Sequence, residues 1–279
     1  VDECAPFENV YTLALRGLHD RAMNASNNMS DRKEMLQEAL MAQRQMLVDA
    51  IGKRAEDIPQ AFTPYKEVLD VYDQGLELPD DVTIIWPDDN YGYMKRLSSP
   101  KEQKRSGRSG VYYHSSYLGK PHDHLWMNTT SPTLMYEELR KAYDLTADRI
   151  WLLNAGDIKS CEFAVDYFLT MAFDIDSFNF ERAANYRTEW LCGMLGNDYR
   201  NEYQDVINSF YKLAFARKPE FMGWGYQWAT DKHGRERNTD TDFSLVNYRE
   251  VDTRLAEYRR IGNVAEKILK ALPEDKKAC

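Results

Sequence analysis

Acidic, amide and histidine side chains follow short apolar runs at four places in this chain. The clearest run covers residues 82–86 and ends at Pro87. Active sites in barrels and open α/β sheets are built from the residues that follow parallel strands, so the pattern predicts a polar site assembled from strand ends. Its candidate residues are Arg16, His19 and Asp20 at the first exit, Asp88, Asp89 and Asn90 at the second, His114, His122, Asp123 and His124 at the third, and Asn154, Asp157 and Glu162 at the fourth.

Two of these groups are rich in metal ligands. His122 and His124 flank Asp123, and Asp88 lies beside Asp89. A metal-dependent hydrolase on a barrel places a His-x-His pair at the end of an early strand and further ligands on later strands. Here the two histidines stand several residues beyond the third run. The first hypothesis therefore includes no metal or other cofactor, and a metal-dependent hydrolase of another substrate is kept as an alternative.

Helical patterns alternate with the apolar runs. Leucines recur at helical spacing between residues 31 and 51, with Ser30 as the expected N-cap and Gly52 just past the end. Ser131 is the expected cap of a later helix that starts at Pro132. Strands that alternate with helices are typical of parallel βαβ units. The expected strands are residues 9–16, 82–86, 110–117 and 149–154, and the expected helices are residues 31–51, 65–74 and 132–143.

The strand signals stop near residue 170. Three helical patterns with aromatic-rich apolar faces follow, at residues 179–196, 198–217 and 247–272. We therefore expect two domains, residues 1–172 with the strands and residues 173–279 made of helices. The Lys-, Arg-, Gly- and Ser-rich stretch 101–110 is expected to be an exposed loop.

Composition excludes several classes of protein. The chain has 279 residues, of which 43% are hydrophobic, so it can bury a sizeable core. It carries 36 basic and 45 acidic residues and no basic stripe, so we expect no nucleic-acid partner. No apolar stretch approaches the roughly 18 residues of a membrane span, so no membrane partner is expected either. The four cysteines lack the spacing of a zinc site or a disulfide framework.

Several short segments, taken together and in order, resemble glycoside hydrolase family 115, the xylan α-1,2-glucuronidases. The resemblance covers essentially the whole chain and is most specific between residues 8 and 175. The segments are ENVYTL at 8–13, RGLHD at 16–20, PYKEV at 64–68, PDDVT at 79–83, WPDDNYG at 86–92, RSG at 105–107, GVYYH at 110–114, RIW at 149–151 and GDIK at 156–159.

The resemblance implies an α/β fold, namely the C-terminal part of a TIM-like (β/α)8 barrel followed by an α-helical bundle domain. Members of the family are considerably longer than this chain, so the first barrel strands and the flanking domains are expected to lie outside it. The implied activity is the removal of α-1,2-linked glucuronic acid, or its 4-O-methyl ether, from glucuronoxylan or aldouronic oligosaccharides. A homodimer and a secreted or periplasmic location are also implied.

The implied hydrolysis inverts the anomeric configuration and requires two carboxyl groups in different protonation states. Glu162 and Asp123 are the first pair we assign to this role. Glu162 matches the family stretch that begins at GDIK, whose register is fixed by residues 156–159. The assignment of Asp123 leaves two alternatives open: Asp88 or Asp89 holds the second catalytic role instead, or the general acid lies in the part of the barrel outside this chain.

A uronic acid substrate also needs positive charge or hydrogen-bond donors for its carboxylate. Arg16, His19, His122 and Lys120 are candidates for this clamp, and a buried ion pair is the alternative role of Arg16. Trp126 is a candidate stacking platform for a sugar ring, whereas Trp86, inside an apolar run, is typical of a core residue. The other predicted substrate-binding residues are Asp88, Asp89, Asn90, His114, Asn154, Asp157 and Tyr211.

Two of the acidic candidates have structural alternatives. Asp157 is placed to cap the helix that carries Glu162, and Asp88 is placed to form an Asx-turn. At the level of function, three hypotheses remain: the inverting glucuronidase, the metal-dependent hydrolase, and a catalytically incomplete piece that binds glycans.

Overall fold

The computed structural model describes residues 1, 3–17, 22–23, 28–119, 122–223, 229–230, 236–237 and 240–277. The chain forms two compact units. Unit 1 contains Val1–Asp89, Tyr93–Tyr113 and Leu139–Leu152, and unit 2 contains Asn90–Gly92, His114–Glu138 and Leu153–Cys279. No helix in the described part of the chain is both long and apolar enough to cross a membrane.

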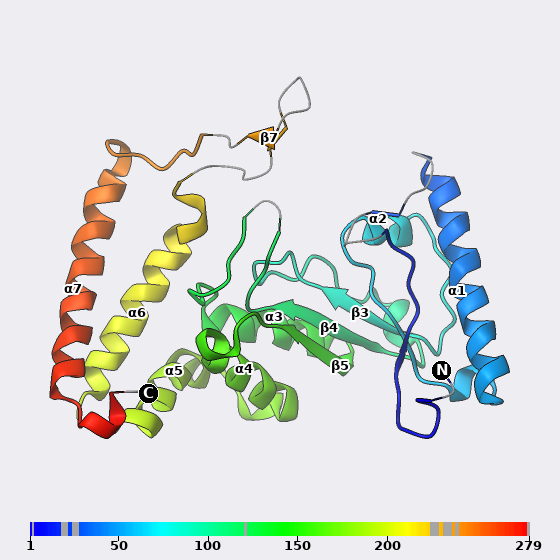
Figure 1. Ribbon diagram of the computed structural model, residues 1–279, viewed down its shortest axis with the longest axis horizontal. Coiled ribbons are helices and arrows are strands. Elements are labelled where there is room, and N and C mark those ends of the chain that lie inside the picture. Colours follow the sequence, from blue (N-terminus) through cyan, green and yellow to red (C-terminus); the bar gives the residue numbers. More distant parts are fainter. Residues whose placement is uncertain are drawn as a thin grey trace. The chain divides into compact units, whose positions relative to one another are not determined.

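A five-stranded sheet forms the centre of unit 1 and confirms the predicted α/β class. Its strands follow the chain in the order β1 (Tyr11–Thr12), β2 (Gln60–Phe62), β3 (Thr83–Pro87), β4 (Ser109–His114) and β5 (Ala147–Asn154). The first four pair in parallel, with Phe62 opposite Ile84 and Pro87 opposite Tyr112. The arrows of β3, β4 and β5 lie side by side in Figure 1. Parallel pairing brings the carboxyl ends of the strands to one edge of the sheet.

Helix α1 (Met29–Ile51) covers part of this sheet through its leucines. Leu36, Leu40 and Leu47 are buried and belong to one cluster with Phe62 of β2. Gly52 ends the helix in the left-handed region, as predicted, because glycine has no Cβ to oppose that conformation. The prediction that Ser30 is the N-cap of this helix was wrong.

Asn28, two residues before Ser30, is the N-cap of α1. Its side-chain oxygen accepts a hydrogen bond from the Ser30 backbone N–H at 3.0 Å. Asparagine and serine are equally good caps, so the sequence pattern does not distinguish the two positions.

Strand β2 was not predicted, because it has only three residues and begins with a polar one. Gln60 is buried, and its amide nitrogen donates to the carbonyl oxygens of Ala55 and Ile58 at 2.8 Å each. Its amide oxygen accepts from Arg44 at 3.1 Å. A buried polar side chain with all these partners satisfied costs little, but it breaks the apolar run on which strand prediction depends.

The 101–110 stretch is not the exposed loop that its composition suggests. It contains the 3-10 turn η3 (Glu102–Lys104), and the Arg105 side chain is largely buried. Arg105 donates to the backbone oxygens of Leu78 and Val82, at 3.0 and 3.1 Å. An arginine with several carbonyl acceptors is stable in a buried position. Through these hydrogen bonds the segment holds the backbone at the start of β3 in place.

Glu102 and Arg96 form a charged network beside β3. The Glu102 carboxylate accepts from the Ser99 N–H and the Tyr72 hydroxyl, each at 2.7 Å, and from Arg96 at 2.9 Å. The Arg96 guanidinium lies 4.5 Å from the ring centroid of Trp86. Trp86 is fully buried and donates to Ser98, which confirms that it is a core residue.

This network predicts that the folded state loses stability at low pH. Burial of Glu102 favours its neutral form, but hydrogen bonds from Ser99, Tyr72 and Arg96 outweigh burial and hold the pKa of Glu102 below its ordinary value. Because the folded-state pKa is depressed, its stabilising contribution is present at neutral pH and is lost as the pH falls through that pKa.

We expect Glu102→Gln to lower the free energy of unfolding at pH 7 by about 1–3 kcal/mol. In urea unfolding, its difference from the wild type should shrink only as the pH falls through the depressed pKa of Glu102, below the ordinary range of a glutamate, where the carboxylate becomes neutral in the folded wild type as well. The exposed Glu56→Gln is the control. An undiminished difference at low pH would contradict this account of Glu102.

Helices dominate unit 2. The predicted cap of α3 (Pro132–Asp144) is confirmed, because the Leu134 N–H donates to the Ser131 hydroxyl at 3.2 Å, although the helix itself continues into unit 1 from Leu139. Helices α6 (Arg200–Ala216) and α7 (Glu250–Ala271) lie alongside each other in Figure 1, with Tyr211 and Ile268 in a shared apolar cluster. Helices α4 (Ile158–Phe173) and α5 (Phe180–Leu195) belong to the same unit.

A short antiparallel pair of strands, β6 (Ala229–Thr230) and β7 (Glu236–Arg237), contradicts the expectation that strands stop near residue 170. A strand of two residues is too short to show the alternation of apolar and polar residues by which strands are predicted. The division into domains 1–172 and 173–279 stays a prediction, because units 1 and 2 group the residues by spatial contact and interleave along the chain.

Candidate active site

Arg16, which follows β1, and Glu67, which begins α2 (Glu67–Asp73), form a two-point ion pair in unit 1. The Arg16 Nε donates to one carboxylate oxygen of Glu67 and a terminal nitrogen donates to the other, both at 3.1 Å. Each side chain is 20% exposed. A planar guanidinium pairs with a carboxylate through two parallel hydrogen bonds in this way. The ion pair therefore connects the residues that follow β1 to those that follow β2.

Two cations lie against one aromatic ring in the same place. The Arg16 guanidinium lies 5.5 Å and the Lys66 ammonium 5.1 Å from the ring centroid of Tyr65. Tyr65 in turn meets the edge of Tyr112 on β4, with 5.6 Å between ring centroids. The backbone oxygen of Tyr112 accepts a hydrogen bond from the N–H of Asp88 at 3.1 Å.

These contacts join the exits of β1, β2 and β3 in one cluster. We call it the strand-end cluster and define it as Arg16, Tyr65, Lys66, Glu67 and Asp88. It combines two positive charges, the Glu67 carboxylate and an aromatic face, and Asp88 is connected to it through its backbone N–H and Tyr112. Cations and carboxyl groups are what is needed to hold an anionic sugar and to transfer protons to and from it.

The backbone of Lys66 is strained. Its φ of 51° and ψ of −122° are unusual for a residue with a Cβ, and such strain costs on the order of 1–3 kcal/mol. Strained residues concentrate at functional sites, where the surrounding structure holds a side chain in a required position. Here the strained residue carries the ammonium group that lies 5.1 Å from the centroid of the Tyr65 ring.

Replacing Lys66 with glycine tests this strain. Glycine in a loop ordinarily destabilises a protein slightly, but relief of a positive φ stabilises by roughly 0.4–1 kcal/mol, so we expect Lys66→Gly to be neutral or stabilising. Lys53→Gly, at an exposed position outside the helices and strands, is the matched control and should destabilise. The midpoint of urea unfolding measures both. A clear loss of stability for Lys66→Gly would show that its backbone is not strained.

Asp88 and Asp89 have different environments. Asp88 is 1% exposed, and its backbone forms a bridge with Met94. The Asp89 carboxylate accepts a hydrogen bond from the N–H of Tyr93 at 3.1 Å, and the Asp89 N–H donates to the Tyr93 oxygen at 2.8 Å. The side chain of Asp89 therefore holds the turn, a role that we had considered for Asp88. Asn90 follows with a left-handed φ of 72°.

Three histidines form an aromatic cluster in unit 2. The His122 ring meets the Phe221 ring edge-on, with 4.2 Å between the ring centroids. His114 is fully buried and meets the Tyr117 ring edge-on at 5.6 Å. His124 lies 5.1 Å from the Tyr91 ring, and its Nε2 is 2.5 Å from the Asn90 oxygen. The polar groups that follow β4 are thus packed against rings, and their positions are fixed by ring contacts.

Tyr91 fixes the backbone near the predicted catalytic residue Asp123. The Tyr91 hydroxyl donates to the His122 oxygen at 2.6 Å and accepts from the His122 N–H at 3.0 Å. Asp123 itself is half-buried, and its carboxylate accepts from the Gly119 N–H at 2.5 Å. Asp123 is therefore a positioned carboxylate that also closes its own loop.

Glu162 lies in the first two turns of α4 and is 36% exposed. Lys159, one turn earlier, is 3.6 Å away, a spacing typical of a surface ion pair. Asp157 occupies the N-cap position, but its side chain makes no capping hydrogen bond. Its backbone oxygen accepts from the Ser160 hydroxyl at 3.0 Å.

Two further predicted substrate-binding residues have structural partners, and a third lies outside the described residues. The Asn154 backbone oxygen accepts from the N–H groups of Ser115 and Ser116, at 3.0 and 3.3 Å. Tyr211 is buried in the helical core, where its hydroxyl accepts from Arg187 at 2.6 Å and burial raises its pKa. His19 is among the residues that the structure does not describe.

The sequence reasoning missed Glu67 and Lys66 as individual site residues. They lie in the PYKEV segment, which contributed to the family resemblance, but no apolar run marks the three-residue strand before it. In the described part of the chain, no three His, Cys, Asp or Glu side chains are grouped closely enough to hold a metal ion. The metal-dependent alternative gains no support from these residues.

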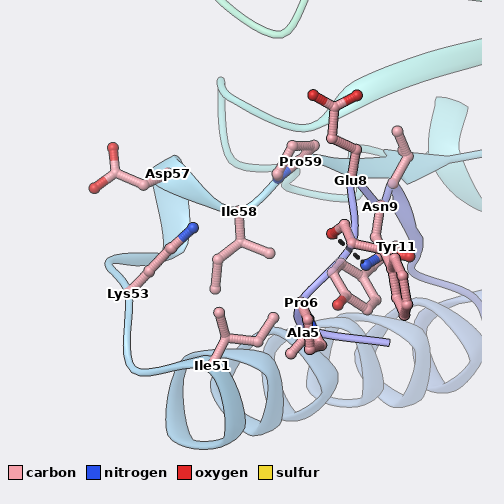
Figure 2. Close-up of a pocket in the computed structure, with 12 residues that line it drawn as sticks. Ala5, Pro6, Glu8, Asn9, Tyr11, Ile51, Lys53, Asp57, Ile58 and Pro59 are labelled. Carbon is pink, nitrogen blue, oxygen red and sulfur yellow. Dashed lines mark hydrogen bonds between the residues drawn. The ribbon is translucent and has the colours of Figure 1, made fainter. Parts of the chain in front are cut away.

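A large open cavity of unit 1 lies at the opposite edge of the sheet. It has a volume of about 750 Å³ and is lined by the segment before β1, the end of α1 and the segment before β2. Figure 2 shows Lys53 and Asp57 on one side, Ile58 in the middle with Ile51 below it, and Pro6 and Glu8 on the other side. Because active sites of parallel-strand proteins lie at the carboxyl ends of the strands, we place the chemistry at the strand-end cluster despite the size of this cavity.

The parallel sheet and its strand-end carboxylates are typical of a glycoside hydrolase. The model of glycosyl hydrolase family 115 matches residues 1–221. A solved structure, described as a novel family GH115 4-O-methyl-α-glucuronidase, BtGH115A, with specificity for decorated arabinogalactans, superimposes with a TM-score of 0.87 and 38% sequence identity. The chain therefore belongs to glycosyl hydrolase family 115.

The match covers 99% of this chain and 36% of the solved one, so the chain spans about a third of the length of that neighbour. No curated protein matches the chain.

Proposed function

We propose that the protein is an inverting α-glucuronidase that removes α-1,2-linked glucuronic acid or 4-O-methyl-glucuronic acid from xylan side chains. Membership of family 115 and the name of the solved neighbour support the reaction. The single observation that carries it is the strand-end cluster, where Arg16 and Lys66 flank the Tyr65 ring beside the Glu67 carboxylate.

The same comparison supports a finer description of the fold. We infer that the parallel strands belong to the later half of a TIM-like (β/α)8 barrel, and that residues 173–279 form a helical bundle domain after the barrel residues 1–172. Short strands joined by helices, in the spatial order of the chain, are the repeating unit of such a barrel.

Arg16 and Lys66 are the proposed clamp for the uronic acid carboxylate. An arginine fork offers two parallel hydrogen bonds to a carboxylate, and a lysine adds a point charge. In the structure Arg16 binds Glu67, so the ion-pair role considered for Arg16 is also present. The two roles are compatible, because the same fork orients Glu67 and adds positive charge beside a bound anion.

Glu67 and Asp88 are the carboxyl pair that we favour for the chemistry. An inverting enzyme needs one group that protonates the leaving oxygen and another that activates water. Asp88 is almost fully buried, whereas Glu67 is 20% exposed and is held by the Arg16 fork, so the two carboxyl groups stand in different surroundings.

The pair predicted from the sequence, Glu162 and Asp123, stays a prediction. Glu162 is 36% exposed and has a surface lysine as its partner, and Asp123 is bound by a backbone N–H. The other predicted binding residues, among them His114, Asn90 and Trp126, also stay predictions.

Release of uronic acid from glucuronoxylan tests the proposal. The complete protein is incubated with glucuronoxylan and with decorated arabinogalactan, with and without chelator, and free acid is measured by anion-exchange chromatography. We expect release from glucuronoxylan at the same rate in both conditions. Release that stops with chelator would favour a metal-dependent hydrolase. Binding of aldouronic oligosaccharides without any release would favour a glycan-binding piece.

We also propose a homodimer and a location outside the cytoplasm, secreted or periplasmic. Polymeric xylan does not enter cells, which supports the location, and the family resemblance supports the dimer. Sedimentation velocity of the complete protein should give twice the monomer mass. A monomer at all concentrations would exclude the dimer.

A further inference from the structure

A second cavity of unit 1 lies between the two segments that precede strands β3 and β4. It has a volume of about 620 Å³, which is within the roughly 300–1,000 Å³ of ligand pockets. One wall comes from residues 72–80, between the end of α2 and β3, and the other from residues 96–105, before β4. Both walls lie at the amino ends of parallel strands, at the opposite edge of the sheet from the strand-end cluster. We call this space the amino-edge cavity.

Side-chain contacts hold the two walls of this cavity together. The Tyr72 hydroxyl of one wall donates to the Glu102 carboxylate of the other at 2.7 Å. The Nε of Arg96 is 3.0 Å from the Asp73 carboxylate. Arg105 adds the bonds to backbone oxygens before β3 that were described with the fold. Because the walls are already fixed, little ordering is required when a ligand binds between them.

The two arginines of the cavity have hydrogen-bonding capacity that the protein does not use. The Nη1 of Arg96 and the Nε of Arg105 are buried and have no acceptor among the residues that the structure describes. The Arg105 side chain is only 10% exposed. A buried donor without an acceptor is unfavourable. The guanidinium groups therefore have more donors than the protein supplies with acceptors, which favours a ligand rich in oxygen atoms.

Two exposed side chains on opposite walls, Lys101 and Glu77, add a donor and an acceptor. Within the described part of the chain, neither of them forms an ion pair. The backbone of Glu77 is bound to the side-chain amide of Gln37 by two hydrogen bonds of 2.8 Å each, so the position of this wall is fixed from α1. An ammonium group donates hydrogen bonds and a carboxylate accepts them, and a hydroxyl group is able to bind both.

The lining distinguishes between classes of ligand. Four carboxylates and three cations line the cavity, so it has no excess of positive charge for an anion. Among the described residues, no three His, Cys, Asp or Glu side chains are grouped closely enough to hold a metal ion. The apolar lining residues Tyr72, Leu76 and Leu78 are buried or half-buried, whereas a protein partner needs exposed apolar anchors. A neutral ligand with many hydroxyl groups fits this lining best.

We propose that the amino-edge cavity is a second glycan-binding site, which binds an unbranched, neutral stretch of the xylan main chain. The class of ligand follows from the lining, and the choice of xylan rests on the proposed function. The sugar hydroxyls accept hydrogen bonds from Lys101 and the two arginines and donate to Glu77. Binding at this edge leaves the strand-end cluster free, so the site holds the polymer without taking part in hydrolysis.

Isothermal titration calorimetry of the complete protein with neutral xylohexaose tests the proposal. This ligand carries no uronic acid and has no bond that a glucuronidase cleaves. The wild type should bind it, and Lys101→Ala combined with Glu77→Gln should raise Kd about tenfold. Lys104→Ala combined with Glu56→Gln is the matched control, because both side chains are exposed and lie outside the cavity, and it should leave Kd unchanged.

Hydrogen exchange measured by mass spectrometry locates the bound sugar. With xylohexaose present, backbone amides of residues 72–80 and 96–105 should exchange more slowly, because a ligand that bridges the two walls opposes their local opening. Exchange in residues 63–67, beside the strand-end cluster, should be unchanged.

Several results would overturn the proposal. These are no binding by the wild type, equal binding by the Lys101 and Glu77 double variant, and protection confined to residues 63–67. Tighter binding of glucuronate than of xylohexaose, with protection of the same two walls, would make the cavity an anion site.

The failure of this inference is distinguishable from the failure of the proposed function. If xylohexaose protects both walls but the wild type releases no uronic acid from glucuronoxylan, the proposed function fails and the glycan site stands. If uronic acid is released but xylohexaose does not bind in the cavity, only the glycan site is rejected.

Discussion

Glu67→Gln is expected to lower kcat for uronic acid release by about 10²–10⁴-fold, the range of general acid–base catalysis, while the protein stays folded. Glutamine keeps the shape of the side chain and can still accept a hydrogen bond from Arg16, but it neither gains nor loses a proton at neutral pH. KM should change little, because the substrate carboxylate is bound by the cations of the cluster. Release from glucuronoxylan, with circular dichroism as the check on folding, measures the effect.

Asp81→Asn is the matched control for this variant. Asp81 pairs with Arg44 at 2.7 Å, and both side chains are about as buried as those of Arg16 and Glu67. It should lose stability and keep turnover. If Glu67→Gln behaved like Asp81→Asn, Glu67 would be a structural ion-pair partner only.

Three further carboxylate variants complete the comparison. Asp88→Asn is expected to lose turnover as Glu67→Gln does. Glu162→Gln and Asp123→Asn test the pair predicted from the sequence, and a loss of turnover in either without unfolding would return that residue to the catalytic pair. Full turnover in Glu162→Gln would show that our first assignment was wrong.

Arg16→Lys is expected to lower kcat/KM for uronic acid release by about 10–100-fold, which corresponds to the roughly 1.5–3 kcal/mol of a charged hydrogen bond. Lysine keeps the charge but loses the planar fork, so neither Glu67 nor a substrate carboxylate is bound at two points. The loss should appear mainly in KM if the fork binds substrate, and mainly in kcat if it only orients Glu67.

Arg44→Lys is the control, since Arg44 forms a similar half-buried pair with Asp81. It should lower the free energy of unfolding without changing either kinetic constant. An Arg16→Lys protein with unchanged kcat and KM would remove Arg16 from the site.

The parts of the fold that were predicted correctly are those with long, regular apolar patterns. Strand β3 is buried over all of its residues, and its apolar run and terminal proline marked it plainly. Helix α5 was expected from residue 179, and Asn179 does cap it by accepting from the Arg182 N–H. Such elements are determined by local sequence, because burial and capping act over one or two turns.

The parts that were missed depend on contacts between distant residues. Strand β2 is short and begins with Gln60, which is acceptable in the core only because Arg44 and two carbonyl groups meet its amide. The same is true of Glu67, whose partner Arg16 stands 51 residues earlier. Strand-end position led to Arg16 and Asp88 of the candidate site, but it could not identify Glu67 without β2.

The account is tested most directly by watching the first product of hydrolysis. Proton NMR of glucuronoxylan with the complete protein should show the β-anomer of the uronic acid appear first, followed by slow mutarotation to the equilibrium mixture, because an inverting enzyme turns the α-linkage into a β-product. Glu67→Gln should show neither anomer at the same protein concentration. Initial release of the α-anomer, or no release of uronic acid by the wild type, would contradict the account.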